Sequence, residues 1–191
     1  MLEYDFMQHA FMAGTIIALI CGIISVFVVL RRNAFAAHAL SHTSLTGASG
    51  AMLIGFSTLT GQLALNIVAG IFMGIIGDKV KKNDLAVSIV LTFFLGLGTY
   101  FLFLYQNHYA GDIMGIFFGN ILSVSITQIK VLLGLSVFVL ILLCASGRQL
   151  LFASIDPVIA KAHHLSLRAL SILFFIILAI AISMACQIVG V

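Results

Sequence analysis

The chain has 191 residues, of which 62% are hydrophobic and 8% are charged, and its mean hydropathy is +1.25. A soluble domain is nearer half apolar and a quarter charged, so nine basic and six acidic side chains are too few to cover a soluble fold of this size. The composition excludes a disordered chain, a nucleic-acid-binding protein and a secreted disulfide scaffold. It indicates an integral membrane protein in contact with the lipid bilayer.

Six apolar runs are long enough to cross a bilayer as helices, which takes about 20 residues each. They cover residues 7–30, 34–59, 61–77, 85–105, 130–145 and 167–191. The runs are continuous rather than alternating, which excludes an outer-membrane barrel. The predicted fold is all-α, a polytopic transmembrane helical bundle in one domain over residues 1–191. The acidic start is unlike a cleaved signal peptide, so the first run is expected to stay as a span.

Basic residues gather after the first run, after the third run and between the last two runs. They are Arg31, Arg32, Lys79, Lys81, Lys82, Arg148, Lys161 and Arg168. The positive-inside rule places all three groups in the cytoplasm and the N-terminus outside, with Lys130 as the one exception. The short apolar run 113–129 then cannot cross the membrane, and we expect a re-entrant element on the outer side.

Glycines recur every four residues in two places. Gly111, Gly115 and Gly119 would form a smooth stripe on a helix of the re-entrant element, whose start Asp112 could cap. Gly70 and Gly74 repeat the spacing in the third run, where we interpret them as ordinary helix packing.

The second run is unusually polar, with two histidines and a series of serines and threonines between residues 34 and 59. Such a helix cannot face lipid on all sides, so it belongs inside the bundle or beside a water-filled path. We expect it to be broken near Gly47.

His38 and His42 share one helix face because they are four residues apart, and together they could bind one metal ion. Imidazole suits zinc, iron and copper. Two interior histidines bonded to backbone carbonyls would fit the same spacing. The cost of ionisable groups at membrane depth favours a functional role, but both interpretations stay open.

The polar stretch 148–166 contains Asp156 and Pro157, which are typical of a helix start. The short amphipathic helix that follows, through residue 164, is either a docking helix for a cytoplasmic partner or an interfacial helix on the membrane. The sequence contains no Gly-Lys-Ser/Thr phosphate loop, so the chain cannot hydrolyse ATP by that route.

Four segments carry a family resemblance, in the same order along the chain. They are RRNAFAAHALSHTSLTG (31–47), KNDLAVSIVLTFFLGLG (82–98), GDIMGIFFGNILSVS (111–125), and DPVIAKA (156–162) with QIVGV (187–191). Together they resemble the permease subunits of bacterial metal-ion ABC transporters, which move zinc, manganese or iron.

The resemblance implies a transporter subunit of the bacterial inner membrane, with no catalysis and no permanently bound cofactor of its own. It implies a second permease copy, a cytoplasmic ABC ATPase and an extracytoplasmic metal-binding protein as partners. The transported divalent metal would meet His38 and His42. Asp156, Pro157, Ala160 and Lys161 would couple the permease to the ATPase.

Three departures from the family pattern matter. The glycine that follows the coupling helix in the family is replaced here by His164, so we expect the turn there to differ. The family usually has Asp where this chain has His38, and a pair of imidazoles favours zinc over manganese. The family also continues beyond its counterpart of Val191, so we expect this chain to lack one or more C-terminal spans.

Two other functions fit the residues less well. A haem-binding membrane oxidoreductase would need histidines on facing helices, whereas His38 and His42 share one helix. A siderophore or cobalamin permease would need a wide path and would leave the histidine pair unexplained.

Overall fold

The computed structural model describes residues 4–79, 83–105, 115, 117–119, 121, 124–155, 160 and 166–191. Within these residues it contains six long helices and no strand. The helices are α1 (Asp5–Leu30), α2 (Ala34–Ile54), α3 (Thr58–Lys79), α4 (Asn83–Tyr105), α6 (Ile126–Ile155) and α8 (Leu167–Val189). All but α2 are long and apolar enough to cross a membrane, because the polar side chains of α2 lower its hydropathy. The predicted all-α transmembrane bundle is confirmed.

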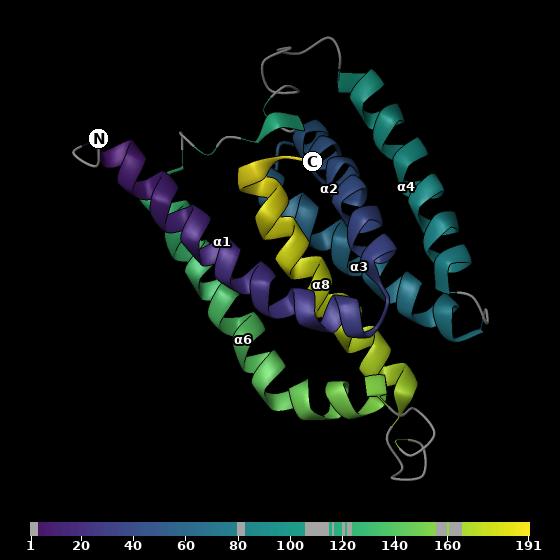
Figure 1. Cartoon of the computed structure of the whole chain (residues 1–191). Helices are drawn as coiled ribbons and strands as arrows, with labels where there is room; N and C mark the ends of the chain where they lie inside the picture. The colour runs from purple at the N-terminus through teal and green to yellow at the C-terminus, as the bar shows by residue number, and fades with distance from the viewer. Residues whose placement is uncertain are drawn as a thin grey trace.

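The helices alternate in direction (Figure 1). The C-terminal ends of α1, α3 and α6 and the N-terminal ends of α2, α4 and α8 lie toward the lower end in this view. The N-terminus, the connection from α2 to α3, and the C-terminus lie at the upper end. Helix α4 ends and α6 begins at this upper end as well.

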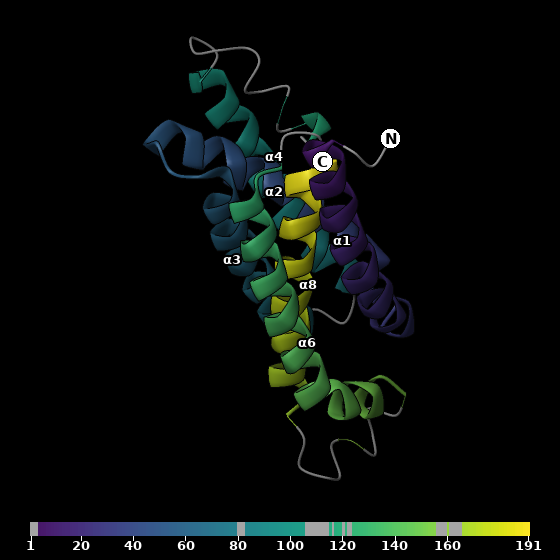
Figure 2. The same ribbon diagram turned by 90° about the vertical axis from the view of Figure 1, so that its left-hand side faces the viewer.

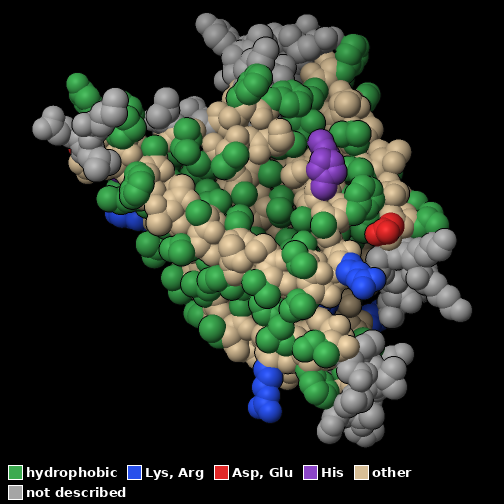
Figure 3. All heavy atoms as spheres, viewed as in Figure 1, with side chains coloured by type: hydrophobic (Ala, Val, Ile, Leu, Met, Phe, Trp, Pro, Cys, Tyr) green, Lys and Arg blue, Asp and Glu red, His purple; other side chains and the backbone are tan. Residues whose placement is uncertain are grey.

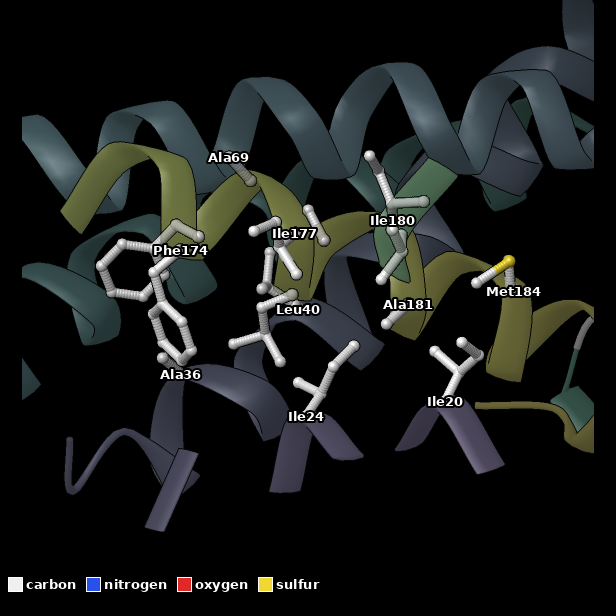
Figure 4. Packing of buried hydrophobic residues seen from close by; sticks show 14 of the residues in the cluster. Ile20, Ile24, Ala36, Leu40, Ala69, Phe174, Ile177, Ile180, Ala181 and Met184 are labelled. Atoms are coloured by element: carbon white, nitrogen blue, oxygen red, sulfur yellow. The ribbon is translucent and has the colours of Figure 1, made fainter. Parts of the chain in front are cut away.

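Helix α8 lies at the centre of the bundle and contributes the largest part of the core. Its buried side chains pack against α1, α2 and α3, as Figure 4 shows for Ile177 near Leu40 and Ala69 and for Ala181 near Ile20 and Ile24. Helices α1 and α6 lie together on one side of α8, and α2, α3 and α4 lie on the other (Figures 1 and 2).

The predicted break of the second span near Gly47 is wrong, because α2 is continuous from Ala34 to Ile54 and ends at Gly55, whose φ is 82°. Gly47 is instead a packing position. A Cβ atom added to Gly47 would lie 2.5 Å from the carbonyl oxygen of Gly61 on α3. The two glycines therefore let the backbones of α2 and α3 touch.

Helix α6 extends beyond the predicted apolar run 130–145 at both ends, from Ile126 to Ile155. Gly147 and Leu150 are buried in this extension, and Gly147 lies beside Phe27 of α1. The continued packing explains why the helix does not stop at Ser146 or Arg148. The last turns of α6 bend away from its main axis (Figure 2).

The glycine pairs of the sequence analysis behave differently. Gly70 and Gly74 lie against Phe175 and Ile172 of α8, so their interpretation as helix packing is confirmed. Gly119 has a φ of 68° and lies outside any helix, so the predicted helical stripe is wrong there. Gly111 and Asp112 lie outside the described residues.

The segment around Gly119 packs on the end of α8. The Val191 amide donates a hydrogen bond to the Phe117 carbonyl oxygen over 3.1 Å. A Cβ atom on Gly119 would collide with the backbone of residues 188–190, so only glycine fits this contact and this φ.

Replacement of Gly47 by valine is expected to push α2 away from α3 and to lower stability by about 1–3 kcal/mol or more. The measurement is the thermal unfolding midpoint of the purified protein in detergent. Gly22→Val on α1 is the matched control, because nothing lies within 4 Å of that position. Equal midpoints for the two variants would contradict the proposed backbone contact.

Candidate functional site

The polar helix α2 lies inside the bundle, as predicted. It packs on α3, α4 and α8, and Thr43, Ser44, Thr46 and Ser49 are fully buried. Each of these hydroxyl groups needs a hydrogen-bond partner, because water is not available to most of the buried surface. The partners come partly from the carbonyls of α2 itself and partly from neighbouring helices.

Asn66 of α3 supplies partners for two of these side chains and is itself fully buried. The Thr43 hydroxyl donates to Oδ1 of Asn66 over 2.5 Å. The Asn66 amide nitrogen donates to the Ser44 hydroxyl oxygen over 2.6 Å and to that of Ser183 on α8 over 2.9 Å. One amide group therefore joins α2, α3 and α8.

A second contact fixes α2 to α4. The Thr46 hydroxyl donates to the carbonyl oxygen of Phe94 over 2.6 Å. Gly98 makes the approach possible, because a Cβ atom there would lie 2.6 Å from the Thr46 hydroxyl oxygen. The rotation of α2 about its axis is therefore set by hydrogen bonds to α3 and α4, and Asn66 in turn joins α3 to α8.

The sequence analysis missed Asn66 and its neighbour Gln62, which lies one turn earlier on α3. Gln62 is also buried, and its Oε1 is the buried side-chain polar atom without a hydrogen-bond partner among the described residues. The sequence pattern that identifies these two residues is a pair of amide side chains, four residues apart, in an otherwise apolar run.

His38 and His42 lie side by side on α2, as their spacing predicts. Their ring centroids are 4.6 Å apart and the rings meet edge to face at 86°. His38 is exposed and His42 is partly buried. Figure 3 shows histidine atoms on the open surface, bordered by hydrophobic side chains and by atoms of the backbone and uncharged polar residues. His38 is therefore not an interior histidine within the described bundle.

The two imidazoles on this face are side chains of a type that can bind a metal ion. Within the residues that the structure describes, no group of three or more His, Cys, Asp or Glu side chains could hold a metal ion. The described part of the chain thus offers this pair alone rather than a full set of ligands. Such a pair leaves coordination positions open for water or for further ligands.

The residues predicted to contact an ATPase are mostly outside the described part. Asp156, Pro157 and Lys161 lie outside the described residues. Ala160 is helical and fully buried.

Replacement of Asn66 by leucine keeps a similar volume and removes all three of its side-chain hydrogen bonds. We expect a loss of about 2 kcal/mol in stability, since hydrogen bonds between membrane helices average about 0.6 kcal/mol each. Unfolding in detergent measures the loss. Ser136→Ala, which removes a weak contact between α6 and α8 at 4.0 Å, should change stability much less. An Asn66→Leu protein as stable as the Ser136→Ala protein would disprove the role of Asn66.

Comparison with known proteins places this arrangement in a wider context. The ABC 3 transport family matches residues 3–191. The chain is 32% identical, over its whole length, to the manganese transport system membrane protein MntC of Halalkalibacterium halodurans. It is 28% identical, over 98% of its length, to the manganese import system permease protein ScaB of Streptococcus gordonii. It spans 65% of MntC and 67% of ScaB.

The fold is also similar to that of a solved structure, PsaBC from Streptococcus pneumoniae in complex with Fab. The TM-score is 0.82 at 26% sequence identity, and the match covers 99% of this chain and 68% of that chain. These relatives are membrane components of transport systems, which agrees with the prediction of a transporter subunit rather than an enzyme. With five apolar helices of spanning length and a family match over almost all of its residues, this multi-pass membrane protein belongs to the ABC 3 transport family.

Proposed function

We propose that this chain is the permease subunit of an ATP-driven importer of a divalent transition-metal ion, and that His38 and His42 bind the ion in transit. The observation that supports this most directly is the pair of imidazole rings, 4.6 Å apart, on the open face of an otherwise buried polar helix. The names of the relatives MntC and ScaB, which refer to manganese transport and import, support a metal cargo.

The chemistry of the pair suits a transported ion. Both side chains lie on one face of α2, about 6 Å and about 12 Å along the helix from Ala34, at 1.5 Å per residue. Neutral imidazole is a good ligand for divalent transition metals. Two ligands bind an ion less tightly than the four of a structural zinc site, so the ion can be released.

A second copy of the chain would complete the ligand set. The face of α2 that carries Phe35 and His38 is exposed, whereas most of the helix is buried. If this face meets its counterpart in a homodimer, two histidine pairs provide four imidazoles around one path. The exposed Phe35 beside the pair fits burial in such an interface.

The remaining partners follow from the distribution of charge. We place the end of the bundle that carries Arg31, Arg32, Arg148 and Arg168 in the cytoplasm of a bacterial inner membrane, with the N-terminus outside. A cytoplasmic ABC ATPase would bind around Asp156, Pro157, Ala160 and Lys161. An extracytoplasmic metal-binding protein would deliver the ion at the opposite end.

Replacement of His42 by alanine should reduce metal uptake to background, because one imidazole alone is a weak ligand. The protein should still insert and fold, since His42 is only partly buried. Uptake of radioactive zinc and manganese by cells that produce each variant tests this, with membrane protein levels measured in parallel. His9→Ala on α1 is the matched control. Normal uptake by the His42→Ala protein would remove the histidine pair from the mechanism.

The second prediction concerns the choice of metal. We propose that the two imidazoles favour zinc over manganese, although MntC and ScaB are named for manganese. His38→Asp restores a carboxylate and should shift the zinc-to-manganese uptake ratio toward manganese by about tenfold, or about 1.4 kcal/mol. His38→Asn controls for size without the charge. If the wild-type chain already prefers manganese, or if the Asn variant shifts equally, the bis-imidazole explanation fails.

A further inference from the structure

Arg31 is the C-cap residue of α1 and is partly buried, whereas Arg32, Lys130, Arg148 and Arg168 are exposed. Its Nε donates a hydrogen bond to the Ser154 hydroxyl oxygen over 3.0 Å. Its guanidinium carbon lies 4.9 Å from the ring centroid of Phe174.

These two contacts join helices that are far apart in the sequence. Ser154 belongs to the last turn of α6, and Phe174 is a fully buried side chain of α8. The contacts need the planar guanidinium, which stacks on an aromatic ring while its edge donates a hydrogen bond. Burial lowers the pKa of Arg31, yet arginine stays protonated at any physiological pH.

On one side, Arg31 is connected rigidly to α2. The amides of Arg32 and Asn33 donate to the carbonyl oxygens of Val29 and Val28, each over 3.0 Å, so the junction between the helices is a closed turn. The amides of residues 36 and 37 then donate to the Asn33 carbonyl oxygen, which begins α2. His38 follows Arg31 by seven residues, so no flexible linker separates the two.

On the other side, Arg31 holds the end of α6. The Ser154 hydroxyl donates to the carbonyl oxygen of the fully buried Leu150 over 2.5 Å and accepts the hydrogen bond of Arg31. Ser154 precedes Asp156, the proposed start of the ATPase contact, by two residues.

The α1–α2 junction, the end of α6 and the start of α8 all lie at the same end of the bundle (Figures 1 and 2). Phe174 and Ala36 of α2 lie at one end of the packed core (Figure 4).

We infer that Arg31 is a positioning residue that passes movement of the α6 end to α2 and its histidine pair. The inference rests on the proposed function, because it assigns to Arg31 the step between the ATPase and the metal path. Arg31 contacts neither the metal nor the ATPase in this scheme. Loss of the Arg31 side chain should therefore uncouple ATP hydrolysis from transport, while the permease still binds both the metal and the ATPase.

The experiment uses the full 191-residue chain, purified from its own host in mild detergent with the ATPase that accompanies it, and reconstituted into vesicles. Zinc uptake, manganese uptake and ATP hydrolysis are measured in the same vesicles, and the readout is the number of metal ions moved per ATP. Arg31→Gln should lower this ratio by about fivefold or more, the lower end of coupling between protein sites.

Arg32→Gln is the matched control, because it removes one positive charge from the adjacent position and Arg32 is exposed with a φ of 55°. Its ratio should stay close to wild type. Arg31→Lys keeps the positive charge but lacks the planar guanidinium group. The number of metal ions that it moves per ATP should fall between those of wild type and Arg31→Gln. Ser154→Ala removes the acceptor of the Arg31 hydrogen bond, together with the hydroxyl's own bond to Leu150 within α6, but keeps the contact of Arg31 with Phe174. It should lower the ratio less than Arg31→Gln does.

Equal ratios for Arg31→Gln and Arg32→Gln, whether both normal or both reduced, would overturn the inference. If Arg31→Gln does not insert or assemble, Ser154→Ala decides: an unchanged ratio overturns the inference and a reduced ratio supports it. The proposed function fails separately, and the inference with it, if the wild-type chain recovers no ATPase or moves no metal. A haem absorption band in the purified wild-type protein would point to the oxidoreductase instead.

Discussion

The fold depends on hydrogen bonds to the polar side chains of α2, which are buried away from water. Asn66 does this for Thr43 and Ser44 and at the same time binds Ser183, so α2, α3 and α8 meet at one amide group. At 3.6 residues per turn, Thr43, Ser44 and Gly47 lie on the opposite side of α2 from the two histidines. The bonds that turn one side of α2 toward Asn66 therefore leave the histidine side open.

Small residues make these hydrogen bonds possible. Gly47 and Gly61 bring the backbones of α2 and α3 into contact, and Gly98 lets Thr46 reach the backbone of α4. Hydroxyl and short amide side chains span only a few ångströms, so larger residues at the glycine positions would separate the groups that must bond. Close helix packing and hydrogen bonding of the buried polar side chains therefore depend on the same small residues. Lipid tails are as apolar as the helices, so the hydrophobic effect does not drive helices together within the membrane.

The sequence predicts the features that are set by the residues of a single helix. The apolar runs predict six helices, the polar composition predicts that α2 is interior, and the four-residue spacing predicts that His38 and His42 meet. The break at Gly47 was wrong because a glycine can weaken a helix or admit a neighbour, and only the partner helix decides between them. The partners of Asn66 and Arg31 lie at least 22 residues away in the chain, so no local pattern identifies them.

The same contacts limit how the histidine pair can move. Helix α2 is continuous and has no proline, and it is hydrogen-bonded along its middle to α3 and α4, with α8 bonded to the same Asn66. Bending α2 at Gly47 would break the backbone contact with Gly61, and rotating it would break the bonds to Asn66. Movement of α2 together with the helices bonded to it keeps these bonds intact and therefore costs less. Arg31, at the junction before α2, is where such a movement would be passed on from α6.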